Sequence, residues 1–144
     1  MQHFFIVALL SSIAISVRGQ FIAGGYTEQD PTDPEFMLKA LKATESINEN
    51  VAWNNTPYLL VPIQVVSAKT QVIAGMKTVL EVLFGESGCV KGSGATPAMV
   101  ATYCKPKDGG SRALFTITVI ERSWEDYEQY SVSFVRNVDA NERF

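Results

Sequence analysis

An almost unbroken run of strand-forming residues, at positions 61–84, constrains the fold more than any other feature of the chain. At about 3.3 Å per residue, a single strand of this length would span roughly 80 Å, several times the usual strand length. The chain must therefore reverse direction within the run. Gly75 is the only glycine there, and glycine takes positive φ without steric cost. We predict two antiparallel strands joined by a turn at residues 71–75.

The residues of this predicted turn are unusual because they are apolar. Hairpin turns are normally rich in Asn, Asp, Ser and Gly, whereas Val72, Ile73 and Ala74 precede the glycine here. Exposed apolar loops are typical of binding surfaces. We therefore interpret the turn as a candidate binding surface.

The first residues have the pattern of a secretory signal peptide. Residues 4–17 are apolar but too few to span a bilayer, and Val17 and Gly19 suit recognition by signal peptidase. We predict a signal peptide at residues 1–19 and one secreted, extracellular domain at residues 20–144. An apolar first helix of the folded domain is the alternative. No later segment has about 18 apolar residues without a charge, so we expect no membrane partner.

The predicted domain is large enough to bury a core without a metal or a dense disulfide framework. Cys89 and Cys104 permit one intramolecular disulfide, which an oxidising compartment favours. Two buried free thiols are the alternative. The chain has 12 basic and 15 acidic residues and no basic stripe, so nucleic acid is not expected as a partner either.

The absence of histidine from the predicted domain excludes several kinds of chemistry. The only histidine is His3, within the signal peptide. The domain therefore has no Ser-His or Cys-His nucleophile and no His-ligated zinc. Glu125, Asp126 and Glu128 form the remaining carboxylate cluster, which we interpret as a solvated turn. We expect no cofactor and no enzymatic activity, with a hydrolase based on these carboxylates as a remote alternative.

One amphipathic helix is predicted before the long strand run. Asp33, Pro34 and Glu35 are typical of a helix start, since they supply a cap, a first-turn proline and an acid near the positive end of the dipole. Apolar residues then recur at helical spacing to about Asn50. This face is most simply part of the core.

Two more strands are predicted after a long loop. Residues 112–122 and 128–135 alternate as strands do, and residues 85–111 are expected to be a loop held together by the cysteine pair. One helix must then cover one face of an antiparallel sheet of at least four strands, which is an α+β fold. Pro62 should lie at a sheet edge or a bulge.

Three motifs, in this order, resemble the cystatin family: F-I-A-G-G at residues 21–25, Q-V-I-A-G at residues 71–75 and S-W at residues 123–124. Cystatins have a glycine near the mature N-terminus, a Q-x-V-x-G first hairpin loop and a P-W second hairpin loop. The resemblance covers essentially the whole mature chain. The G-G-Y-x-E-x-D-P start is similar to secreted invertebrate members such as those of nematodes or ticks. The resemblance implies one long helix packed across a curved antiparallel sheet of about five strands.

The resemblance also implies reversible, competitive inhibition of papain-like cysteine proteases, such as those of the cathepsin L, S or B type. In this family the N-terminal segment and both hairpin loops form a wedge that enters the active-site cleft. Trp124 would then supply a flat aromatic anchor, and Gly24 would let the backbone turn away from the catalytic cysteine. The residues implied to contact the protease are Phe21, Ile22, Ala23, Gly24, Gly25, Gln71, Val72, Ile73, Ala74, Gly75, Ser123 and Trp124.

Besides Ile73, which stands at the family's central Val as a conservative change, the chain departs from the family pattern at three positions. Ser123 replaces a proline, which loosens the second loop but keeps its aromatic residue. Ala23 replaces Val or a larger residue, so weaker binding is expected to proteases with a deep apolar second subsite. Phe115 stands where secreted vertebrate members have the first cysteine of a second disulfide.

Two further hypotheses concern other partners. Some cystatins inhibit legumain through an Asn in the turn after the helix, and Asn55 is at that place by its spacing from Gln71. Asn54, Asn55 and Thr56 also form a glycosylation sequon, weakened by Pro57. A cystatin-fold module that binds a partner without inhibiting a protease is the remaining alternative. We expect a monomer, with a domain-swapped dimer through the first hairpin left open.

Overall fold

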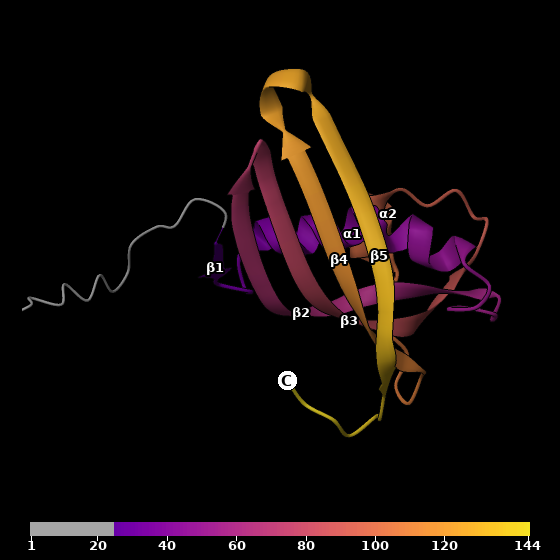
Figure 1. Cartoon of the computed structure of the whole chain (residues 1–144). Helices are drawn as coiled ribbons and strands as arrows, with labels where there is room; N and C mark the ends of the chain where they lie inside the picture. Colours follow the sequence, from indigo (N-terminus) through magenta and orange to yellow (C-terminus); the bar gives the residue numbers. More distant parts are fainter. Residues whose placement is uncertain (1–24) are drawn as a thin grey trace, which may run out of the picture.

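The computed structural model describes residues 25–144, which form a five-stranded antiparallel sheet with a helix packed across it (Figure 1). The sheet order is β1-β2-β3-β4-β5, so each strand pairs with its neighbours in sequence. This confirms the predicted α+β class. The strands are β1 (Tyr26–Gln29), β2 (Tyr58–Ile73), β3 (Gly75–Val90), β4 (Arg112–Arg122) and β5 (Tyr127–Val138).

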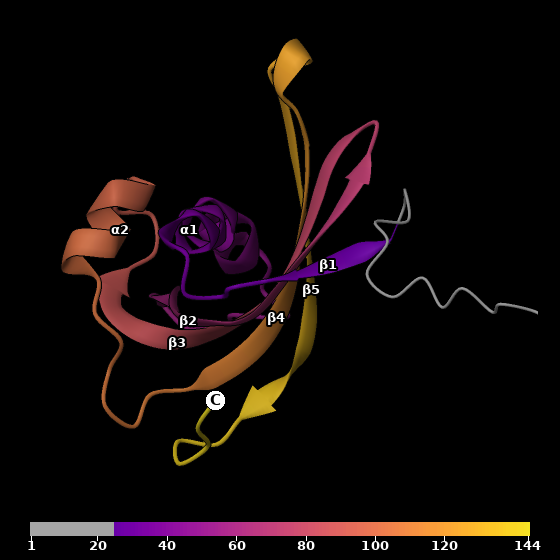
Figure 2. The same cartoon turned by 90° about the vertical axis from the view of Figure 1, so that its left-hand side faces the viewer.

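Helix α1 (Pro34–Glu49) begins where its sequence predicts. The Asp33 carboxylate accepts a hydrogen bond from the backbone N–H of Glu35 at 3.0 Å, which satisfies one of the free N–H groups of the first turn. Figure 2 shows that β2 and β3 curve under α1. The residues that α1 buries against the sheet include Phe36, Ala40, Ala43 and Ile47.

Aromatic rings fill the centre of the core between α1 and the sheet. Phe115, one of the departures from the family pattern, is fully buried there. Its ring meets Phe84 edge-on with centroids 5.3 Å apart, and Trp53 and Phe134 lie edge-on to it at 5.6 and 5.7 Å. Each such pair contributes about 0.5–1.5 kcal/mol beyond area burial. Packing therefore stabilises the strand at a position where a cysteine would have formed a cross-link.

Pro62 lies where the sheet can accommodate it. The partners of β1 on β2 are Ala68 to Gln71, so β2 is an edge strand at Pro62. The register of β2 against β3 also shifts between Pro62 and Gln64. Both conditions remove the need for a backbone N–H at the proline, as predicted.

The predicted loop at residues 85–111 is wrong at its start. Strand β3 continues through Gly85 to Val90 rather than ending at Phe84. A Cβ added at Gly85 would lie 2.5 Å from Cδ1 of Ile63. The glycine is therefore there because the Ile63 side chain from β2 occupies the space above it, and not because the chain turns.

The same segment also contains a short helix, α2 (Pro97–Tyr103), that the sequence analysis missed. It lies beside α1 on the same side of the sheet (Figure 2). The predicted disulfide joins Cys89 to Cys104 with Cα atoms 5.5 Å apart. Val100 and Cys104 pack against Leu41 of α1. Neither helix in residues 25–144 is long and apolar enough to cross a membrane.

Candidate functional site

The β2–β3 and β4–β5 turns lie at the same end of the sheet, and the C-terminus lies at the opposite end (Figure 1). We call residues 71–76 the first tip and residues 122–127 the second tip. Antiparallel pairing in sequence order makes this arrangement necessary, because both hairpins then reverse at the same edge. Motifs that are about fifty residues apart in sequence are thus brought together.

The first tip is tighter than predicted. Ala74 is the only residue between the two strands, and Ile73 pairs directly with Gly75. Gly75 has φ of 118°, a conformation that side chains with a Cβ rarely adopt. The strands bring the apolar residues out to the surface, where Val72 and Ile73 remain 43% and 37% exposed. The expected apolar surface is therefore present.

The second tip is a single turn of 3-10 helix, η1 (Ser123–Glu125). Asp126 ends it with φ of 51°, in the left-handed region that Asp occupies more readily than most residues. Trp124 is 65% exposed, so it is not a core residue. Glu125 and Asp126 are exposed, as expected for a solvated turn. Within residues 25–144 no three His, Cys, Asp or Glu side chains are grouped as metal ligands.

A hollow of about 630 Å³ lies between the two tips. Apolar groups from both tips and acidic groups in and beside the second tip share its wall, with the first turn of α1 at its base. The carboxyl-bearing residues are Glu35, Glu121, Asp126 and Glu128, and the apolar and aromatic ones include Val72, Ile73, Met76, Trp124 and Tyr127.

Ion pairs connect α1 to the strands below the second tip. The Lys39 side chain is nearly buried, with Nζ 2.9 Å from Oε1 of Glu121 and 3.5 Å from Oε1 of Glu35. Lys42 Nζ lies 3.3 Å from Oε1 of Glu128 at a more exposed position. These contacts fix the second hairpin relative to the helix.

Glu128 also accepts a hydrogen bond from the Tyr130 hydroxyl. This bond, together with the Lys42 ammonium, lowers the pKa of Glu128 below its ordinary value. Burial and the same carboxylate raise the pKa of Tyr130. Glu128 is therefore ionised, and Tyr130 neutral, throughout the physiological pH range.

Arg122 joins the two tips, which the sequence analysis did not foresee. Its Nε donates a hydrogen bond to the backbone oxygen of Ala74 at 3.1 Å. Below this bond, Gly75 packs against the Glu121 backbone, so that an added Cβ would lie 2.2 Å from the Glu121 oxygen. In the sequence, a lone arginine at the end of a predicted strand looks like any solvated charge. The sequence therefore gives little indication that Arg122 contacts the first tip.

Strand β1 enters the sheet beside the first tip. Tyr26 pairs with Gln71, and its ring lies under Nζ of Lys69 at 4.6 Å and Nζ of Lys77 at 5.5 Å. Gly25, just before this strand, is exposed. The other N-terminal residues predicted to contact a protease, Phe21, Ile22, Ala23 and Gly24, lie outside the described residues.

Residues 24–124 match the family model described as the cystatin domain, from Gly24, the first glycine of the N-terminal motif, to Trp124 of the second tip. The chain belongs to the cystatin family. Cystatin cpi-1 of Caenorhabditis elegans is 35% identical to it over 144 residues, which cover 99% of this chain and 99% of that protein. Cystatin-2 of Ornithodoros moubata is 30% identical over 136 residues, 94% of this chain and 98% of that protein.

Solved structures, a tick cystatin among them, have the same architecture. The crystal structure of a salivary cystatin from the soft tick Ornithodoros moubata matches with a TM-score of 0.65 and 26% identity, over 80% of this chain and 100% of that one. The crystal structure of Al-CPI matches with a TM-score of 0.62 and 31% identity, over 78% and 100%. Cystatins are generally inhibitors of cysteine proteases and not enzymes.

Asn55 of this cystatin lies away from both tips, in the loop between α1 and β2, and it is exposed. Its neighbour Asn54 is only 4% exposed. The Asn54 Nδ2 donates to Oδ1 of Asn48 at 2.8 Å and to the Tyr58 backbone oxygen at 2.7 Å. The Asn54 backbone oxygen accepts a bond from Lys91. The side-chain amide of Asn54, which the sequon would modify, is therefore buried and hydrogen-bonded. The same bonds fix the loop that exposes Asn55.

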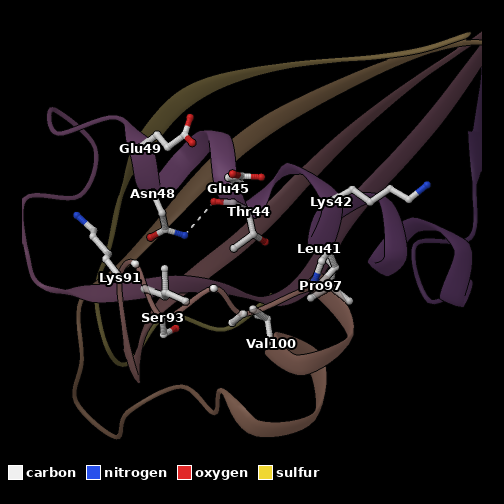
Figure 3. Close-up of a pocket in the computed structure, with 14 residues that line it drawn as sticks. Leu41, Lys42, Thr44, Glu45, Asn48, Glu49, Lys91, Ser93, Pro97 and Val100 are labelled. Atoms are coloured by element: carbon white, nitrogen blue, oxygen red, sulfur yellow. Dashed lines mark hydrogen bonds between the residues drawn. The ribbon is translucent and has the colours of Figure 1, made fainter.

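A second hollow, of about 450 Å³, lies between α1 and the loop before α2 (Figure 3). Leu41 and Val100 contribute apolar walls, and Asn48 is tied to the backbone oxygen of Thr44 at 2.9 Å. Among the described residues, none that is predicted to contact a protease lines it. The predicted contact residues that the fold gathers at one end are Gln71, Val72, Ile73, Ala74, Gly75, Ser123 and Trp124.

Proposed function

We propose that this cystatin is a reversible, competitive inhibitor of papain-like cysteine proteases of the cathepsin L, S or B type. Its two tips and N-terminal segment would enter the active-site cleft together. The observation that carries the proposal is the joint exposure of Val72, Ile73 and Trp124 at one end of the sheet. Apolar side chains on turns are unfavourable in water unless a partner covers them, and family membership gives the class of partner.

Each tip would contribute by excluding water from the cleft. Val72 and Ile73 are already more than half buried in the free protein, so covering the rest is worth less than half of the roughly 1.5–3 kcal/mol that full burial of such a side chain gives. Trp124 has the large, rigid ring that dominates many protein interfaces. The strands that carry the two tips are paired before binding, so these strands lose little ordering entropy. No bond is made or broken on the inhibitor, and competition with substrate is sufficient for inhibition.

The N-terminal segment would occupy the unprimed side of the cleft. Phe21, Ile22 and Ala23 would lie extended in its subsites, and Gly24 would allow close approach to the protease backbone. The pairing of Tyr26 with Gln71 supports this placement, because it fixes the start of β1, just after the N-terminal segment, beside the first tip.

A titration of papain with the recombinant domain, residues 20–144, tests the proposal. We expect stoichiometric, reversible, one-to-one inhibition, and at least a tenfold weaker inhibition constant for Val72→Ala combined with Trp124→Ala, given about 1.4 kcal/mol per factor of ten. Val51→Ala is the matched control, because Val51 is 73% exposed but lies in the α1–β2 loop. Unchanged papain activity would contradict the proposal and favour a cystatin-fold module that binds a partner without inhibiting a protease. Cleavage of the substrate by the protein itself would indicate a hydrolase.

A second activity, inhibition of legumain through Asn55, is proposed from the loop between α1 and β2. Asn55 is exposed, and the buried side chain of Asn54 holds the loop in place. The loop is distinct from the tips, so both proteases could be bound by one molecule. We expect Asn55→Gln to abolish legumain inhibition and to leave papain inhibition unchanged; full legumain inhibition by the variant would contradict the assignment.

We also propose that residues 1–19 are a signal peptide and that the domain is secreted as a monomer. The Cys89–Cys104 disulfide supports an oxidising compartment. N-terminal sequencing of the secreted protein should begin near Gln20, and light scattering should give the mass of one chain. A mature protein that begins at Met1 would contradict the cleavage, and a stable dimer would favour exchange of the first hairpin.

A further inference from the structure

We propose that Arg122 is a positioning residue that holds the two tips in one fixed arrangement before any protease is bound. The inference rests on the proposed function, because it concerns the affinity of the same two tips. It assigns the second tip a support that lies outside the three motifs of the family.

Arg122 contacts both tips with one side chain. It is the last residue of β4, and its Nε donates to the Ala74 backbone oxygen at the turn of the first tip, 3.1 Å away. Its Nη1 lies 3.6 Å from Oε2 of Glu125 in η1. The guanidinium carbon also lies 5.1 Å from the centre of the Tyr127 ring. The side chain therefore touches the first tip and both halves of the second.

These contacts begin where the sheet ends. The register of β3 with β4 runs up to the pair Met76 and Glu121, so the second tip continues beyond this ladder. At the base of the two tips, Gly75 packs directly against the Glu121 backbone. A Cβ added at Gly75 would be 2.2 Å from the Glu121 oxygen, so no space is left between the two hairpins there. Arg122, the next residue after Glu121, adds a side-chain contact between the two tips that lies one residue closer to Trp124.

The chemistry of the second tip explains why such a support is needed. Ser123 replaces the proline of the family pattern, and a serine leaves the backbone more conformational freedom to lose on binding than a proline does. Arginine is suited to compensate, because its planar guanidinium can donate to a carbonyl, pair with a carboxylate and stack on a ring simultaneously. Lysine has a single ammonium and cannot make all three contacts at once.

Measurements on the free protein test the positioning directly. Backbone order parameters of residues 123–126 should be near 0.85, as for a rigid backbone, in the parent, and should fall toward about 0.6 in Arg122→Met. Arg143→Met is the matched control, since Arg143 is exposed on the C-terminal segment, away from the tips. Thermal unfolding of each variant should show that the fold is intact. An unchanged order parameter in Arg122→Met would overturn the proposal.

Inhibition of papain tests the consequence for binding. We expect Arg122→Met to weaken inhibition about five- to tenfold, the order of the cost of immobilising one side chain, and Arg122→Lys to recover only part of this. In a Trp124→Ala background the same substitution should cost less than about twofold, because the anchor that Arg122 positions is gone. Equal losses in both backgrounds would show that Arg122 contacts the protease directly, and would overturn the proposal.

The two measurements separate this inference from the proposed function. If the parent does not inhibit papain, the proposed function fails, and the order parameters still decide whether Arg122 holds the tip. If the parent inhibits papain and the order parameters do not change in Arg122→Met, only the role of Arg122 is lost.

Discussion

Gly75 of the first tip lies against the Glu121 backbone at the base of the second, so closely that a Cβ added at residue 75 would be 2.2 Å from the Glu121 oxygen. The two hairpins therefore meet at a point where a side chain does not fit. The φ of 118° at Gly75 adds a second reason for glycine.

Gly75→Ala should thus affect both stability and inhibition. We expect the free energy of unfolding to fall by about 1–3 kcal/mol from backbone strain, and papain inhibition to weaken because the tips must separate. Gly88→Ala is the control, since Gly88 is an exposed glycine of β3 with no atom within 4 Å of an added Cβ. Melting curves and inhibition constants that match the parent would contradict the tight contact.

Ala23→Val should strengthen binding to proteases whose second subsite is deep and apolar. The substitution adds two methyl groups, each worth roughly 0.8 kcal/mol when fully enclosed. Because ordering of the segment offsets part of this, we expect a three- to tenfold gain, mainly as slower dissociation. A protease with an occluded second subsite should show no gain. Inhibition constants equal within about twofold for both kinds of protease would place the N-terminal segment outside the cleft.

Lys39→Met should destabilise the fold more than Lys42→Met does. Lys39 is nearly buried between Glu35 and Glu121, so its loss leaves carboxylates without their partner and should cost more than the loss of an exposed ion pair. Lys42 pairs with Glu128 in a more exposed place, where an ion pair is worth about 0–1 kcal/mol. Chemical denaturation of both variants measures the difference. Equal losses of unfolding free energy in the two variants would contradict the idea that burial makes the Lys39 ion pairs more important than that of Lys42.

Tyr130→Phe should make the protein less stable at neutral pH and nearly the same in acid. The Tyr130 hydroxyl lowers the pKa of Glu128 in the folded state. Ionised Glu128 therefore stabilises the fold above its unfolded pKa, and this contribution is lost as the pH falls through the folded pKa. Melting temperatures should converge once the pH has fallen below the lowered pKa of Glu128. Tyr103→Phe is the control, because Tyr103 is exposed, and a difference for Tyr130→Phe that persists in acid would show another cause.

The disulfide should be complete in the secreted protein and should contribute to stability. Mass spectrometry after alkylation without reductant should find no free thiol. Reduction, or Cys89→Ser combined with Cys104→Ser, should cost around 3 kcal/mol, because the bridge closes a loop with a sequence separation of 15. Detection of two alkylated cysteines would contradict both the bridge and the compartment inferred from it.

The parts of the fold that follow local rules could be predicted from sequence. Three local patterns predicted the structure that is found. Gly75 turns the chain within the long strand run, Pro62 lies at a sheet edge and a register shift, and Asp33 caps the helix that begins at Pro34. The exposure of Trp124 was also expected, from the hairpin tip predicted there and from the resemblance to the cystatin family.

The parts that depend on distant neighbours could not be predicted. Gly85 has the sequence signature of a turn but remains in β3, because the Ile63 side chain from another strand lies over it. The contact of Arg122 with Ala74 joins two hairpins and has no local pattern. Helix α2 is too short for a recognisable period, and its apolar contacts with α1 stabilise it instead.

The burial of Asn54 determines when its side chain is accessible for modification. Its Nδ2, the atom to which a glycan would be attached, donates to Asn48 and Tyr58 once the loop has folded. A sugar can therefore be added only while the loop is still open, and it would then displace both hydrogen bonds. A glycan at Asn54 and the described conformation of this loop therefore exclude one another: a molecule has either the sugar or the two hydrogen bonds.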